Sequence, residues 1–214
     1  MSIFNENYYI SKNDLIPEIV QDIYSEVKNS GYYNNNANKY LDYVIRNYKS
    51  NNRYNYPIDD KSEIYKKIHP IIKSFNNFFR NYLISKNNEL IKHKFNIYPS
   101  SVEIAIVKPG AEETEIIKNE KLNIFIPLND ISYNNGIVTV INETDKLNIN
   151  ENNNYGFLHD YDEEIQQTIL SNEVKIDNLV GDIIFIQANA YTRCLKNDTD
   201  NIRACIQLLY DIKK

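Results

Sequence analysis

The stretch KLNIFIPLND, residues 121–130, indicates the fold more clearly than any other part of the sequence. Its apolar residues Leu122, Ile124, Ile126 and Leu128 recur at every second position, which is typical of a strand, and the Asn-Asp pair that follows favours a turn. The same alternation predicts further strands along the chain, at about 101–107, 113–118, 136–142, 173–177, 181–187 and 201–211. Short strands separated by turns predict a β-sandwich or barrel.

The residues before this region have a helical period instead. Apolar residues spaced three and four apart predict a helix over about 14–29, a short second helix over about 41–48, and a longer third helix whose apolar face runs from Ile64 to Leu83, with a kink expected at Pro70. We therefore expect one α+β unit, with a helical layer over 1–95 and a β domain over 96–214. An insertion at about 143–172, helical near 163–170, interrupts the β domain.

Composition excludes several classes of function. The chain has 214 residues, 24 basic and 29 acidic side chains, and a net charge of −5, so it offers no basic field for nucleic acid. Every apolar run is too short to cross a membrane. The two cysteines are too few for a disulfide framework and the first residues do not resemble a signal peptide, which favours a cytoplasmic protein. Heavy use of Asn, Ile, Lys and Tyr, without Trp, is typical of an AT-rich genome.

Three segments carry a resemblance to a known family. They are KLNIFIPLND, then NNGIVTVINETDK at 134–146, then LVGDIIFIQANAYTRCLKNDTDNIRACIQLLYD at 179–211. Their order resembles the second half of the phytanoyl-CoA dioxygenase family, whose members are iron(II)- and 2-oxoglutarate-dependent oxygenases. The matching elements are Leu128-Asn129-Asp130, Asn135-Gly136, Gly181-Asp182, Asn197 and Arg203. The resemblance covers about residues 100–212 and implies a double-stranded β-helix, which is a jelly-roll, cupin-like fold.

The resemblance also assigns a carboxylate site. Arg203 follows Asn197 at the family spacing and occupies the place of the arginine that holds the distal carboxylate of 2-oxoglutarate. The strand alternation puts Arg203, Cys205 and Gln207 on one face, and a guanidinium fork fits a carboxylate with two parallel hydrogen bonds. We therefore expect Arg203, with Gln207 and Thr192, to bind a small carboxylate, for which 2-oxoglutarate is a candidate. The competing interpretation is a structural arginine paired with Asp182 or Asp200.

The metal-binding pattern of the family is missing. The resemblance places its His-x-Asp pair on Ile117 and Asn119 and its distal histidine on Thr192, and none of these three can supply a strong iron(II) ligand. The chain has only three histidines, His69, His93 and His159, and none is followed two residues later by an acid. The sequence thus predicts no metal site and no required cofactor.

Two alternatives for a metal site stay open at this stage. Glu113 and Glu115 would offer carboxylates if the strand register were shifted, although an exposed edge strand explains them as well. His159 with Asp160 and Asp162 forms the only cluster of histidine and acids, and it is also explained as an acidic loop before a helix. Iron(II) enters only in these interpretations.

The sequence therefore favours a pseudo-oxygenase that binds a small carboxylate or a protein partner. An active 2-oxoglutarate-dependent oxygenase with unusual ligands is the second hypothesis, and a metal-independent enzyme that uses the barrel pocket is the third. A fold alone does not select among them.

Overall fold

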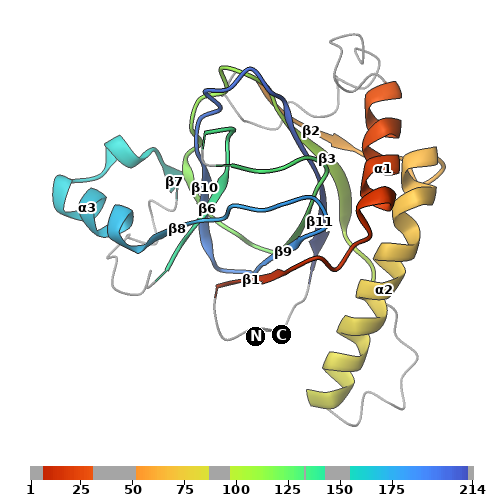
Figure 1. Cartoon of the computed structure of the whole chain (residues 1–214). Coiled ribbons are helices and arrows are strands. Elements are labelled where there is room, and N and C mark those ends of the chain that lie inside the picture. The colour runs from red at the N-terminus through yellow and green to blue at the C-terminus, as the bar shows by residue number, and fades with distance from the viewer. Residues whose placement is uncertain (1–6, 31–51, 87–96, 133, 143–154, 212–214) are drawn as a thin grey trace.

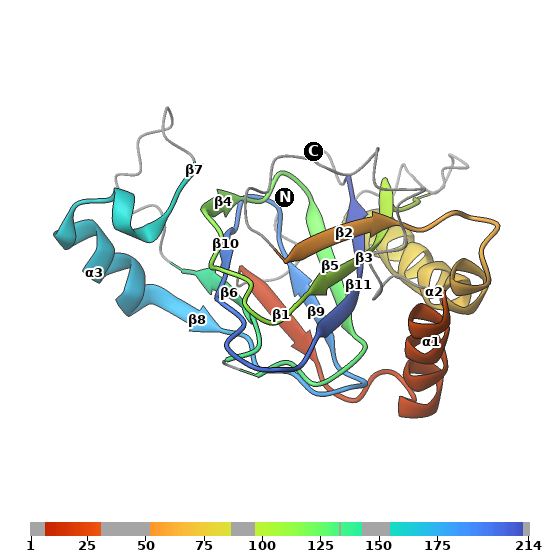
Figure 2. The ribbon, with the colours of Figure 1, turned by 90° about the horizontal axis from the view of Figure 1, so that it is seen from above.

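Two antiparallel β-sheets lie face to face and helices cover their outer sides (Figure 1). The computed structural model describes residues 7–30, 52–86, 97–132, 134–142 and 155–211. Helices α1 (Pro17–Asn29) and α2 (Glu63–Lys86) lie on one side of this pair of sheets. Helix α3 (Glu163–Asn172) lies on the opposite side, as the view from above also shows (Figure 2). The arrangement is a jelly-roll-like β fold between two helical layers.

The larger sheet, sheet A, has six strands in the order β1-β9-β5-β11-β3-β2. Each neighbouring pair is antiparallel, and β11 contacts both β3 and β5 along most of its length. In chain order the strands are β1 (Tyr8–Ser11), β2 (Arg53–Pro57), β3 (Ser101–Val107), β5 (Leu122–Pro127), β9 (Ile183–Ile186) and β11 (Arg203–Tyr210). The central position of β11 places its side chains in the middle of both faces of the sheet.

The smaller sheet, sheet B, has five strands in the order β7-β4-β10-β6-β8. It faces the inner side of sheet A, and β10 lies between β4 and β6. In chain order the strands are β4 (Ile116–Lys118), β6 (Val138–Ile141), β7 (Tyr155–Gly156), β8 (Glu173–Lys175) and β10 (Tyr191–Cys194). A one-turn 3-10 helix, Leu158–Asp160, connects β7 to α3.

Sheet A is apolar on its outer face because two helices cover it. The outward residues of β3, β5, β9 and β11 pack against α1 and α2 in one cluster of buried side chains. Phe75 meets Phe185 edge to face, with ring centroids 5.7 Å apart, and Phe79 meets Tyr210 at 4.9 Å. The helix contacts explain why apolar residues of α2 recur at helical spacing, as the sequence predicts.

The inner faces of the two sheets enclose a second cluster, which includes Ala105, Phe125, Val138, Val140, Ile184, Ile186 and Cys205. A third, smaller cluster joins α3 to the outer face of sheet B through Ile116, Ile141, Ile169 and Tyr191. Along each central strand of sheet A, side chains therefore alternate between the helices on the outer face and the interior between the sheets.

The structure differs from the sequence predictions in several places. The sequence predicts only helices before residue 96, whereas β1 and β2 come from that part and pair with β9 and β3. Strand β10 lies where the sequence predicts a connection, and β4 is shorter than the expected 113–118. These strands are short, so they carry little alternation. Helix α2 continues through Pro70, and the expected helix over 41–48 lies outside the described residues.

The helix of the insertion is confirmed as α3, at Glu163–Asn172. None of the helices within the described ranges combines the length and apolar character that crossing a membrane requires. The division into 1–95 and 96–214 stays a prediction.

Two neighbouring phenylalanines of α2 test this packing. Phe79 is fully buried against sheet A, and Phe78 is 49% exposed. We expect Phe79→Ala to lower the free energy of unfolding by about 4 kcal/mol, because it leaves a cavity under the helix. Phe78→Ala is the matched control and should cost less than about 1 kcal/mol. Urea unfolding followed by circular dichroism measures both, and equal losses would show that α2 does not pack on sheet A as described.

Candidate functional site

Strand β11 places three side chains in a row on the inner face of sheet A. Arg203, Cys205 and Gln207 alternate with Ala204, Ile206 and Leu208, which belong to the cluster under the helices. Cys205 belongs to the interior cluster, so its two neighbours on the same face are directed inward as well. Burial raises the pKa of the Cys205 thiol to about 11, which leaves it protonated. The face that the sequence assigns to Arg203, Cys205 and Gln207 is therefore the one directed at the interior.

Arg203 is almost completely buried, with 2% of its surface exposed. Its guanidinium donates a hydrogen bond through Nη1 to the carbonyl of Gly136, and its Nε is buried without a hydrogen-bond partner in the described part of the chain. The expected alternative partner, Asp182, binds Lys12 instead, with Nζ and Oδ2 2.8 Å apart. No carboxylate among the described residues, Asp200 included, forms an ion pair with Arg203. A buried guanidinium with an unused donor is a candidate anion-binding group.

The three positions to which the sequence resemblance assigns the metal ligands lie together. Thr192 of β10 is opposite Ile117 of β4 in the sheet register. Asn119 follows β4 and donates from Nδ2 to the Thr192 hydroxyl at 3.1 Å and to the carbonyl of Ala190 at 2.9 Å. The Ile117 alkyl group, and an Asn119 amide and Thr192 hydroxyl that are hydrogen-bonded to each other, do not fit an iron(II) ion, which favours imidazole or carboxylate ligands.

A chain of side-chain hydrogen bonds continues from this point across the barrel. Asn123 Nδ2 donates to Asn119 Oδ1 at 2.7 Å, and Gln207 Nε2 donates to Asn123 Oδ1 at 3.0 Å. Asn55 Nδ2 contacts Gln207 Oε1 at 3.5 Å, at the far end of the chain. We call Asn55, Gln207, Asn123, Asn119 and Thr192 the amide chain. It connects strands of sheet A to the β4 and β10 end of sheet B.

The amide chain was only partly predictable. The strand alternation singles out Gln207 and the resemblance singles out Asn119 and Thr192, whereas Asn55 and Asn123 were missed. Asn123 is the one polar side chain within a run of buried residues in β5, and 5% of its surface is exposed. A polar residue at an interior position of a strand is the signal that indicates it, because such a group needs a partner. Asn55 could not be recognised in this way, because the sequence predicts no strand around it.

The two histidines within the described residues, His69 and His159, lie away from this site. His69 lies exposed on α2 beside Tyr65, and His159 is exposed and stacked on Phe157 in the 3-10 helix outside sheet B. His93 lies outside the described residues. Within the described ranges, no group of three or more His, Cys, Asp and Glu side chains could hold a metal ion.

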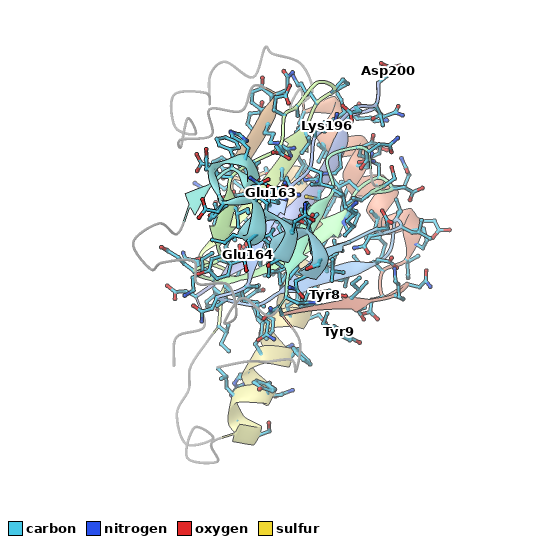
Figure 3. The ribbon with its side chains drawn as sticks, turned by 90° about the vertical axis from the view of Figure 1, so that its left-hand side faces the viewer. Tyr8, Tyr9, Glu163, Glu164, Lys196 and Asp200 are labelled. Atoms are coloured by element: carbon cyan, nitrogen blue, oxygen red, sulfur yellow. The ribbon has the colours of Figure 1, made fainter. Side chains whose placement is uncertain are left out.

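The acidic alternatives lie on the outer side of sheet B. Glu113 binds Arg193 there, with Oε2 and Nη1 3.0 Å apart, and Glu115 is exposed. Asp160 and Asp162 are exposed near α3, whose outward side carries the glutamates labelled in Figure 3. None of these carboxylates faces the amide chain.

Several of the turn residues that carry the sequence resemblance connect strands through hydrogen bonds. Asn129 receives a hydrogen bond from the Ala204 backbone N–H at 2.8 Å and donates to the carbonyl of Ile202 at 2.9 Å, so it holds the start of β11. Asp130 accepts the Val180 backbone N–H at 3.1 Å. This motif therefore joins three separate segments of chain.

Asn197 has a similar structural role and is fully buried. Its Nδ2 donates to the carbonyls of Val107 and Asn201, and its Oδ1 accepts from Thr199. Asn197 also forms an isolated β-bridge with Asn135. Asn197 thus stabilises the turn that precedes Arg203.

Asp182 stabilises a third turn, the one that precedes β9. It accepts backbone N–H groups of Asn13 and Leu179 at 3.1 Å each, in addition to the Lys12 ammonium. Gly181 has a φ of +98°, and an added Cβ would lie 2.9 Å from the Leu15 carbonyl, so only glycine fits. Burial raises the pKa of Asp182, but these hydrogen bonds outweigh it and hold the pKa below its ordinary value.

A buried ion pair on the other face of β10 was not predicted. Arg193 binds Glu173 through Nε at 2.7 Å and Nη2 at 2.9 Å, and Thr139 donates to the same carboxylate at 2.6 Å. Both partners are at least 96% buried. Burial raises the pKa of Glu173, but the hydrogen bonds from Arg193 and Thr139 outweigh it and lower the pKa from its ordinary 4.5. The pair joins β8 to β10 and holds the insertion on sheet B.

Comparison with solved structures identifies proteins that share this fold. The 2-oxoglutarate- and 5-hydroxyectoine-bound EctD of S. alaskensis superposes with a TM-score of 0.65 at 14% identity, covering 96% of this chain and 72% of that one. The fold is that of iron- and 2-oxoglutarate-dependent oxygenases. SnoK, an alpha-ketoglutarate-dependent carbocyclase of nogalamycin biosynthesis, gives 0.59 at 12% identity over 96% of this chain and 80% of its own.

A Pseudomonas putida prolyl-4-hydroxylase gives a TM-score of 0.55 at 9% identity, covering 98% of this chain and 95% of that one. No model of a known protein family matches the sequence, and no curated protein matches it. The likeness therefore establishes the fold of these oxygenases, and the phytanoyl-CoA dioxygenase resemblance stays a hypothesis.

The Glu173 ion pair predicts how stability depends on pH. Because the folded pKa is lowered, the ionised carboxylate stabilises the fold fully above pH 4.5 and loses this effect as the pH falls through the folded value. Glu173→Gln should therefore lower the free energy of unfolding by about 3 kcal/mol at pH 7, with the loss shrinking below pH 4.5. Urea titrations at several pH values measure it, with Glu163→Gln on the exposed side of α3 as the control. A loss independent of pH would contradict the ion pair.

Proposed function

We propose that this chain is a metal-independent member of the oxygenase fold, a pseudo-oxygenase that binds a small carboxylate at Arg203. The observation that carries this proposal is the burial of Arg203 with an unused Nε donor and no carboxylate partner in the described parts of the chain. A buried cation without a counter-charge is costly, so an anionic ligand that supplies the charge is strongly favoured.

The surroundings of Arg203 support a carboxylate in particular. The Gly136 carbonyl binds Nη1 of the guanidinium and leaves its Nε donor without a partner among the described residues. Such a fork matches the two oxygens of a carboxylate better than it matches a single oxygen. Gln207 and Thr192, the other residues proposed to contact the ligand, belong to the amide chain of the same interior.

Iron does not take part in this proposal. The side chains at the corresponding positions, Ile117, Asn119 and Thr192, do not form an iron(II) site, and two of them are hydrogen-bonded to each other. The 2-oxoglutarate present in EctD belongs to that protein. For this chain 2-oxoglutarate is one candidate among small carboxylates.

Thermal shift with a panel of small carboxylates, 2-oxoglutarate included, tests the proposal. The unaltered protein should be stabilised by at least one of them, and Arg203→Met should weaken that binding roughly tenfold or more. Arg203→Lys keeps the charge but lacks the fork, so it should bind less tightly than the unaltered protein. Arg80→Met, an exposed arginine on α2, is the control for loss of a positive charge.

The result has a clear contrary outcome. If no carboxylate stabilises the unaltered protein, or if stabilisation is the same in Arg203→Lys and Arg203→Met as in the unaltered chain, Arg203 is a structural residue and the proposal is wrong.

A further inference from the structure

The amide chain continues on sheet A into a carboxylate that no part of the proposed function uses. Glu103 of β3 is the register partner of Gln207, and the alternation of β3 directs it inward with Ala105. Ser101 donates to Glu103 Oε1 at 2.6 Å, which fixes the carboxylate. Unlike Arg203, the residues Glu103, Gln207 and Asn55 are half-buried, so this end of the interior is reached from solvent.

The hydrogen bonds already made leave a defined set of groups for a ligand. Both N–H groups of Asn119 are used, by Ala190 and Thr192. One N–H of Gln207 is used by Asn123, so its second N–H and the Thr192 hydroxyl hydrogen have no acceptor in the described parts of the chain. On the acceptor side, Glu103 Oε2 has no donor among the same residues. Gln207 and Glu103 are register partners, so a donor and a charged acceptor lie next to one another there, while the Thr192 hydroxyl lies at the other end of the amide chain.

This mixture distinguishes between ligand groups. A second carboxylate would be repelled by Glu103 and could not donate to it. A hydroxyl accepts a hydrogen bond from Gln207 and donates one to its register partner Glu103, so it satisfies both kinds of group at once. An alkyl group would leave all of them without partners.

We infer that the preferred ligand is a hydroxy acid, whose carboxylate binds Arg203 and whose hydroxyl binds between Gln207 and Glu103, and that it binds more tightly than a dicarboxylate of the same length. This inference rests on the proposed function, because the same ligand places its carboxylate on Arg203. It adds the second contact and the class of ligand, and it assigns Glu103 a role in selectivity.

Isothermal titration calorimetry of the whole protein with γ-hydroxybutyrate and with succinate tests it, since the two have equal chain length and differ in one end group. We expect the hydroxy acid to bind roughly tenfold more tightly. Glu103→Gln keeps the shape and removes the charge, so succinate should then bind about as well as γ-hydroxybutyrate. Glu163→Gln on α3 removes the same charge far from the interior and should leave the preference unchanged.

The outcomes separate the two proposals. If both ligands bind and depend on Arg203, but succinate binds as tightly as the hydroxy acid or Glu103→Gln leaves the preference intact, the inference is wrong and the carboxylate site stands. If neither ligand binds the unaltered protein and no other small carboxylate does, both are wrong. A preference for the hydroxy acid that Glu103→Gln removes supports the inference.

Discussion

Sheet A is buried on both faces, and this constraint governs the rest of the molecule. Its outer face must be apolar because α1 and α2 cover it, and its inner face must either be apolar or satisfy its polar groups internally. The residues of the amide chain meet most of that requirement through one another, whereas Arg203 does not, because its Nε has no partner in the described part of the chain. The 2.7 Å hydrogen bond from Asn123 to Asn119 carries the amide chain from sheet A to the end of β4, so a polar interior is compatible with a closed barrel.

Two members of the amide chain, Asn119 and Thr192, are at positions to which the sequence resemblance assigns metal ligands. A metal ion held by those positions would join β4 to β10 within sheet B, whereas here hydrogen bonds between neutral side chains join that end of sheet B to sheet A. Each neutral amide is both donor and acceptor, so the chain extends without leaving a buried charge. Arg203 is the exception, since it brings a full positive charge into the interior, and that charge is the clearest indication of a ligand.

The fold was more predictable than the site. Alternation identified most strands of the β domain, because a strand with one apolar face leaves a period of two in the sequence. Strands β1, β2, β7 and β10 were missed, since they lie in segments that the sequence assigns to the helical layer, the insertion or a connection, and their pairing depends on distant partners. The family-like turn residues such as Asn129 and Asn197 proved to hold the ends of strands, which explains why they indicate a fold more reliably than an activity. Asn55 and Glu103 could not be assigned from sequence because their place beside Gln207 is set by strand register.

The most direct measurement is an anaerobic titration with iron(II) and 2-oxoglutarate, followed by the visible charge-transfer absorption of the complex. The unaltered protein is compared with a variant that carries Ile117→His, Asn119→Asp and Thr192→His, which places two imidazoles and a carboxylate at the same positions. If the amide chain replaces a metal centre, only the variant develops the absorption band. A band in the unaltered protein would contradict the account.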